Sequence, residues 1–176
     1  MLGQNSIDEA IARRKRNDFP NGINAVIFLL HKPAGQGTKA NVLSFDDPRV
    51  AEFFALVDRR HPFKVGMDSC NVPGAIHFCK SGLPESLDTC EGGRFSCYIG
   101  ADMIMVPCSF DHQKRYEVSL KEMTIIEAWN SEPFERFRDK MRGACPDCEK
   151  KALCMGGCPL MPEIVFCNSE KRQIKE

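Results

Sequence analysis

Four cysteines stand close together in the stretch Cys145-Pro-Asp-Cys148-Glu-Lys-Lys-Ala-Leu-Cys154-Met-Gly-Gly-Cys158, which spans fourteen residues. In a Cys-x2-Cys turn, two sulfur atoms can converge on one point while the intervening amide N–H groups face them and stabilise thiolates. The two glycines between Cys154 and Cys158 let the backbone approach closely there. This spacing predicts a bound metal or metal cluster, and the alternative is a loop of reduced thiols.

The wider cysteine-rich stretch holds eight of the chain's ten cysteines. They are Cys90, Cys97, Cys108, Cys145, Cys148, Cys154, Cys158 and Cys167. The sequence does not open with a charged leader and an apolar stretch, so we expect the chain to be cytoplasmic. In that compartment thiols stay reduced unless a metal binds them, which favours metal over disulfide bonds.

Charge and hydropathy exclude two classes of partner. Among the 176 residues, 24 Lys and Arg balance 24 Asp and Glu, so no basic field indicates a nucleic-acid partner. The longest purely apolar run, Ala25 to Leu30, is far shorter than the ~20 residues that span a bilayer. We therefore expect neither nucleic acid nor membrane as a partner.

Residues 1 to about 70 have the pattern of an α/β crossover unit. Ser6 opens a helix with a capping-box pattern, and residues 23–30 form a nearly continuous apolar run typical of a strand buried on both faces. A helix capped by Asp47 and a strand over residues 63–68 follow. A parallel strand that is buried on both faces needs neighbouring strands at both of its edges and a second covering layer. This sequence supplies neither. We therefore expect this segment to be the tail of a larger domain, completed by missing sequence or by a partner chain.

The remaining sequence predicts a linker and a small domain. Residues 71–89 form the linker, a helix and a loop, and residues 97–101 and 103–106 form a hairpin. Thr124 opens a short helix with a second capping box, and Ser131 caps a longer helix that leads to the dense cysteine run. Residues 169–176 are a charged tail.

The region from Cys90 onward resembles the SPASM domain, the auxiliary-cluster domain that follows the catalytic barrel in many radical SAM enzymes. The resemblance rests on Cys90-Glu-Gly-Gly, Val106-Pro-Cys108, Ile126-Glu-Ala-Trp129 with Phe134 and Phe137, the Cys-x2-Cys-x5-Cys-x3-Cys run, and Cys167. The strand end Phe28-Leu-Leu-His-Lys-Pro33 resembles the last part of the radical SAM partial barrel. The resemblance implies an α+β fold: a remnant of a parallel α/β partial barrel, then a SPASM-type domain over residues 90–168 with a β-hairpin, short helices and cluster-binding loops.

In that family the domain holds two 4Fe-4S clusters whose ligands interleave along the chain. The resemblance implies one cluster on Cys90, Cys108 and Cys158, and a second on Cys145, Cys148, Cys154 and Cys167. Cys97 is either the fourth ligand of the first cluster or a core thiol. Cys70 and Cys79 match no family ligand and are expected to be ordinary buried thiols.

The implied function is electron transfer or substrate positioning during anaerobic modification of a peptide or protein. The sequence has no Cys-x3-Cys-x2-Cys motif, by which the family binds the cluster that cleaves S-adenosylmethionine. We therefore expect this chain alone to be inactive, and to need an N-terminal barrel half with which S-adenosylmethionine binds. His31, Lys32, Gly35 and Asp68 follow the carboxyl ends of the two strands, where barrels place active sites. They are candidates for contact with S-adenosylmethionine or substrate, or have structural roles.

Two other functions fit part of the pattern. A zinc-binding interaction module would place the four cysteines of the dense run at one tetrahedral site, which leaves Cys90, Cys108 and Cys167 without a role. A small ferredoxin-like electron carrier would have no need of the α/β segment. One departure from the family is Met103, which stands where the hairpin turn usually has glycine.

Overall fold

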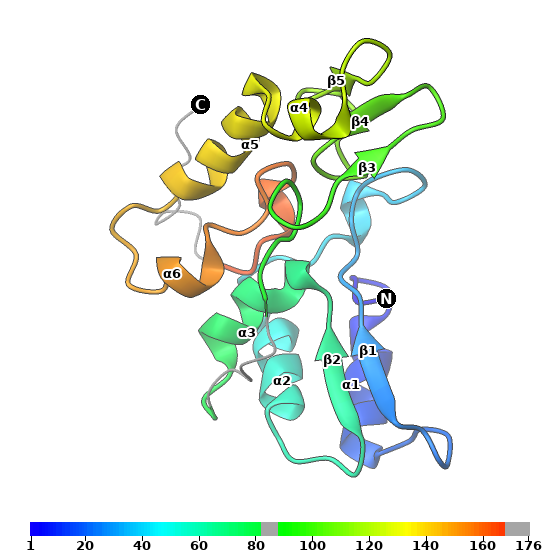
Figure 1. The fold of residues 1–176 in the computed structure, drawn as a ribbon. Coiled ribbons are helices and arrows are strands. Elements are labelled where there is room, and N and C mark those ends of the chain that lie inside the picture. Colours follow the sequence, from blue (N-terminus) through cyan, green and yellow to red (C-terminus); the bar gives the residue numbers. More distant parts are fainter. Residues whose placement is uncertain (82–87, 168–176) are drawn as a thin grey trace.

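The computed structural model describes residues 1–81 and 88–167, which form an α+β arrangement as predicted (Figure 1). A two-stranded parallel sheet and a three-stranded antiparallel sheet lie at opposite ends of the molecule. The strands are β1 (Ala25–Phe28), β2 (Lys64–Met67), β3 (Tyr98–Ile99), β4 (Ile104–Val106) and β5 (Val118–Ser119). The α-helices are α1 (Ile7–Arg16), α2 (Pro48–Val57), α3 (Val72–Phe78), α4 (Ile125–Trp129), α5 (Glu132–Gly143) and α6 (Lys151–Cys154).

The parallel sheet is covered on one face. α1 and α2 pack against this face, where the Phe28 ring lies 4.9 Å from the ring of Phe53. On the other face Ile27 is 65% exposed, and Leu29 just beyond the strand is 51% exposed. The prediction of a strand buried on both faces is therefore not met among the described residues, because only one covering layer is present. β1 is also shorter than the apolar run over residues 23–30.

Two predicted helix caps form and two do not. Asp47 caps α2 and Thr124 caps α4 with a complete capping box. The Ser6 side chain makes no cap to α1; its hydroxyl donates to the carbonyl of Met1 at 2.6 Å and accepts the N–H of Gly3 at 3.1 Å. The Ser131 side chain makes no cap to α5, and its hydroxyl donates to the carbonyl three residues earlier. Both helices form where predicted, so the apolar pattern rather than the serine determines them.

The predicted hairpin forms between β3 and β4, and β5 adds a third strand that the sequence pattern did not indicate. At the turn, the N–H of Met103 donates to the carbonyl of Gly100 at 3.0 Å. Met103 has a φ of 62°, a left-handed conformation that favours glycine. Met103, which stands where the SPASM turn usually has glycine, therefore keeps the geometry of the turn but adopts a strained backbone conformation.

One hydrophobic core joins the N-terminal helices to the C-terminal segment. It includes Phe53 and Phe54 from α2, Phe137 from α5, and Phe166 near the end of the described chain. The ring centroids of Phe54 and Phe166 lie 5.8 Å apart. A Cβ atom at Gly74 of α3 would lie 2.4 Å from the Phe54 ring, so α3 packs directly on this core. α6 lies between α3 and α5 (Figure 1), and α3 contacts it.

The boundaries predicted at residues 70 and 90 stay predictions. The charged tail over residues 169–176 and most of the linker loop lie outside the described residues. In the part of the chain that is described, no helix combines the length and the apolar character needed to cross a membrane.

Candidate functional site

One group of thiols gathers around Cys154, at the end of α6. Burial raises the pKa of the Cys154 thiol, the backbone N–H of Gly156 lowers it, and the nearby thiols of Cys167, Cys145 and Cys148 raise it further. These four cysteines are the set that the resemblance implies for the second cluster. The structure thus brings together thiols that lie up to 22 residues apart in the sequence.

Close backbone packing shapes the loop around this group. Cys145 has a φ of 51°, and the N–H of Cys148 donates to its carbonyl at 3.2 Å, which closes the Cys-x2-Cys turn. Gly156 and Gly157 have φ values of 82° and 76°. A Cβ atom at Gly156 would lie 2.4 Å from the Cβ of Ala144, so only glycine fits this turn.

A second group of thiols forms around Cys90 and Cys158. Burial raises the pKa of Cys90 to about 12, and the thiols of Cys158 and Cys108 add to the shift. Backbone N–H groups face the sulfurs: Met161 donates to the Cys158 Sγ at 3.4 Å, and Gly92 and Phe110 donate to Cys90 and Cys108. The three cysteines are those that the resemblance implies for the first cluster.

Cys70 joins this second group, which the sequence did not indicate. It lies in the 3-10 turn Ser69–Asn71, directly after β2. Burial raises the pKa of Cys70 to about 12, the Lys32 charge opposes the shift, and the thiols of Cys158 and Cys90 add to it. No spacing rule could have found Cys70, because the fold rather than a short motif carries it to the other thiols.

The other two cysteines lie elsewhere. Cys97 is exposed in the segment before β3. The Cys79 Sγ donates to the carbonyl of Phe54 at 3.9 Å, and burial followed by the Asp58 charge raises its pKa to about 11. Cys79 has the environment expected of an ordinary thiol packed on the core.

Two of the predicted strand-end residues form a buried ion pair. The Lys32 Nζ lies 2.6 Å from a carboxylate oxygen of Asp68, and both side chains are largely buried. Burial lowers the pKa of Lys32, but hydrogen bonds and charges from Asp68 and Cys70 outweigh it, so the pKa is raised overall. The Lys32 Nζ also lies 5.3 Å from the centre of the Phe110 ring. Burial raises the pKa of Cys108, and the Lys32 charge opposes part of that shift. Lys32 therefore stands between the strand ends and the thiols.

The other two strand-end candidates lie apart from this pair. The His31 ring is buried, and its Nε2 lies 3.0 Å from the carbonyl of Thr38. Its Nδ1 is buried with no hydrogen-bond partner among the described residues. Gly35 is exposed in the following loop with a φ of 61°.

The thiol groups suit a cluster better than a single ion. Among residues 1–81 and 88–167, no three His, Cys, Asp or Glu side chains are arranged to hold one metal ion. A cubane cluster takes one thiolate on each of its four irons, so its ligands stand farther apart than the ligands of a single ion. Two separate groups of half-buried thiols, with backbone N–H groups directed at the sulfurs, fit such clusters.

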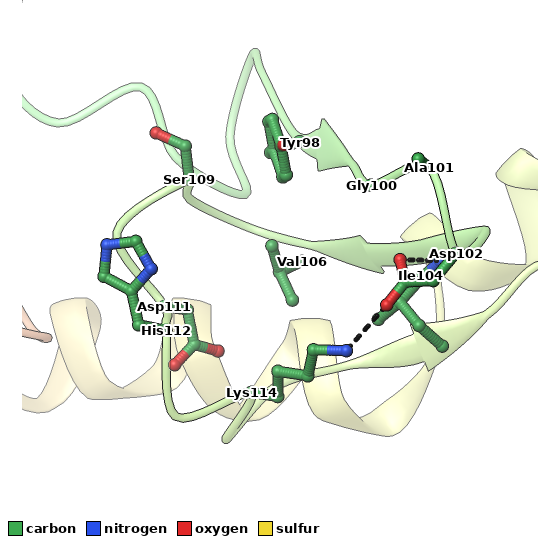
Figure 2. Close-up of a pocket in the computed structure, with 10 residues that line it drawn as sticks. All are labelled: Tyr98, Gly100, Ala101, Asp102, Ile104, Val106, Ser109, Asp111, His112 and Lys114. Atoms are coloured by element: carbon green, nitrogen blue, oxygen red, sulfur yellow. Dashed lines mark hydrogen bonds and ion pairs between the residues drawn. The ribbon is translucent and has the colours of Figure 1, made fainter. Parts of the chain in front are cut away.

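A cavity of about 390 Å³ lies beside the antiparallel sheet, outside the thiol groups (Figure 2). Figure 2 shows Tyr98, His112 and Lys114 along its wall, with Lys114 paired to Asp102 at 2.7 Å. Asp111 has a structural role, because its carboxylate accepts hydrogen bonds from the backbone N–H groups of residues 115 and 116. Sequence reasoning did not find this cavity, because its residues come from the hairpin and from an irregular loop.

Comparison with known families supports the assignment of the cysteine-rich region. Residues 90–150 match the family model described as SPASM, an iron-sulfur cluster-binding domain. No curated protein and no solved structure matches the chain. The chain thus contains a SPASM domain, a domain type that binds an iron–sulfur cluster.

Proposed function

We propose that this SPASM-containing chain is the cluster-holding part of a radical SAM enzyme. It holds two 4Fe-4S clusters that serve electron transfer or substrate positioning during the anaerobic modification of a peptide or protein. One observation carries the proposal. Cys154 lies with Cys145, Cys148 and Cys167, whereas Cys158, four residues later, lies with Cys90. The family's clusters divide the same residues in the same way.

This division favours clusters over the alternative zinc module. A single zinc site needs Cys145, Cys148, Cys154 and Cys158 around one ion. Cys154 and Cys158, on either side of the glycine turn, instead lie with different groups of thiols. A zinc site would also leave Cys90 and Cys167 without a metal-binding role.

The chain's own residues would bind and tune the clusters. Burial keeps the thiols of Cys90, Cys108 and Cys154 protonated when they are free, so each gives up its proton as it binds iron. Backbone N–H groups directed at the sulfurs withdraw charge from the thiolates, which is one way that proteins set a cluster's potential. The Met161 N–H donated to the Cys158 sulfur is such a contact.

The parallel sheet supports a barrel partner. Parallel strands occur almost always in sheets that are covered on both faces. Here Ile27 is exposed on the uncovered face, and the sheet has two strands among the described residues. We therefore propose that further strands of a radical SAM partial barrel complete it, on the same polypeptide or on a partner chain. Lys32, Asp68, His31 and Gly35 would then lie at the barrel end that holds S-adenosylmethionine or substrate.

The experiment that tests the proposal is anaerobic reconstitution of the wild type and of two single variants. Two clusters bind about eight irons, and Cys148→Ser and Cys90→Ser should each lose about four of them. Cys79→Ser is the matched control and should keep all eight, because its thiol belongs to neither group. Unchanged iron in Cys148→Ser would show that the thiol groups do not hold clusters. Without the barrel half, none of these proteins should cleave S-adenosylmethionine under reducing conditions.

A further inference from the structure

We infer that Cys70 is the fourth ligand of the first cluster, with Cys90, Cys108 and Cys158, and that Cys97 is not a ligand. The inference rests on the proposed function, since it names a residue of a proposed cluster site. Cys70 lies outside the stretch that matches the SPASM family, on the segment that follows the parallel sheet.

The turn that carries Cys70 is held firmly in place. Asn71 is buried, and its side-chain amide donates to the carbonyl of Phe28 at 3.1 Å and to the Asp68 carboxylate at 2.7 Å. The Asn71 N–H also donates to the Asp68 carbonyl at 2.9 Å. These contacts tie the turn to the ends of both parallel strands, so the backbone position of Cys70 is fixed before any metal binds.

The surroundings of Cys70 are those of the other three ligands. All four cysteines are half-buried and pack against the same hydrophobic core. The thiols of Cys158 and Cys90 lie near enough to Cys70 to act on it electrostatically, and so does the Lys32 ammonium group. A four-iron cubane with four thiolates needs a fourth cysteine beside Cys90, Cys108 and Cys158, and the resemblance left open whether Cys97 provides it. Cys70 supplies it.

Lys32 adds a second line of support. Its ammonium group lies 2.6 Å from the carboxylate of Asp68, two residues before Cys70, and 5.3 Å from the ring centre of Phe110, two residues after Cys108. Thiolates that are bound to iron carry negative charge into a half-buried site, and such charge is tolerated there when a cation lies beside it. Lys32 reaches the site from the end of β1, held by Asp68.

Cys97 lacks these features. Its thiol is exposed, and it precedes β3, whose residues Tyr98 and Ile99 are exposed too. To bind a cluster in the half-buried group, Cys97 would have to turn inward and carry the edge strand with it. With Cys70 as ligand, the backbone stays as it is.

The test compares Cys70→Ser, Cys97→Ser and the control Cys79→Ser after anaerobic reconstitution, by iron and sulfide content. The expected result is loss of up to four irons in Cys70→Ser and wild-type content in the other two. The four irons of the second cluster are expected to remain in Cys70→Ser, which also shows that this variant folds. As a measurement that needs no variant, the reconstituted wild type is alkylated with iodoacetamide and digested for mass spectrometry. Cys97 should be modified and Cys70 protected.

Each other outcome overturns the inference. Full iron content in Cys70→Ser, loss of iron in Cys97→Ser, or modification of Cys70 in the reconstituted wild type would each exclude Cys70 as the fourth ligand. Such results leave the proposed function intact as long as the wild type binds about eight irons. A wild type that binds no iron and sulfide would instead contradict the proposed function, and this inference with it.

Discussion

Lys32 places a positive charge among thiols that would otherwise concentrate negative charge. Its side chain is largely buried, and it is held by Asp68 at 2.6 Å and by the carbonyl of Leu30 at 3.2 Å. Reduction adds an electron to a cluster, and a nearby cation stabilises the more negative state. Under the proposal, a residue predicted from its strand-end position to touch S-adenosylmethionine or substrate would also act on the first cluster.

Replacement of Lys32 by methionine should make the reduction potential of the first cluster more negative. The shift is expected to be up to about 60–130 mV, since a hydrogen bond to a charged group is worth ~1.5–3 kcal/mol and 59 mV corresponds to a tenfold change for one electron. A redox titration followed by electron paramagnetic resonance measures it. Lys114→Met is the control, because Lys114 pairs with Asp102 at the surface. Equal potentials in both variants would show that Lys32 does not act on the cluster.

At the scale of the element, the β3–β4 hairpin carries a strained turn. Met103 has a φ of 62°, a conformation that costs a residue with a side chain roughly 1–2 kcal/mol. Glycine avoids this cost but loses more conformational freedom on folding, by roughly 0.5–1 kcal/mol. The two effects oppose each other, and the strain is the larger.

Met103→Gly should therefore raise the free energy of unfolding by about 0.5–1 kcal/mol. Urea denaturation of the metal-free chain, followed by circular dichroism, measures the change. Met123→Gly is the matched control: Met123 is also exposed but has no positive φ, so glycine should not stabilise the protein there. A decrease in stability for Met103→Gly would contradict the strain inferred from the backbone.

The elements that the sequence predicted well are those with local signals. α2 and α5 have apolar side chains at helical spacing and lie where predicted, as do both parallel strands and the hairpin. β5 has two residues, and its pairing with β4 depends on how an irregular loop returns. A periodic pattern cannot show such a strand. The serine caps failed for a similar reason, since the Ser6 hydroxyl oxygen accepts the N–H of Gly3 rather than an N–H of the helix.

In the candidate site, too, the residues with local sequence signals were predicted and those that depend on long-range packing were not. The Cys-x2-Cys-x5-Cys run is local, and the resemblance added Cys167, so the four thiols that lie around Cys154 were all named from the sequence. Cys70 stands 20 residues before Cys90, and only packing on the shared core brings the two thiols together. The exposure of Cys97 likewise follows from its place before an edge strand, which a sequence pattern cannot show.

At the scale of the whole molecule, clusters would link segments that the hydrophobic core already joins. The first would tie the turn after β2 to the hairpin and to Cys158, and the second would tie α6 to Cys167. Because metal-binding free energy is also folding free energy, a chain that loses its clusters should lose much of its stability.

Removal of iron by a chelator should lower the thermal midpoint of the reconstituted wild type by at least about 10 °C, since each 1 kcal/mol shifts the midpoint by roughly 2–4 °C at this size. Circular dichroism during heating under anaerobic conditions measures the shift. In the double variant Cys90→Ser with Cys148→Ser, the chelator should change nothing. Equal midpoints with and without iron in the wild type would mean that bound metal does not support the fold.

The central claim is that this chain holds two 4Fe-4S clusters. It is tested most directly by the iron, acid-labile sulfide and zinc content of protein that is purified and reconstituted without oxygen, together with its absorption spectrum. We expect about eight irons, about eight sulfides and a broad visible band. One zinc per chain, with no sulfide and no colour, would contradict the claim and identify the chain as a zinc-binding module.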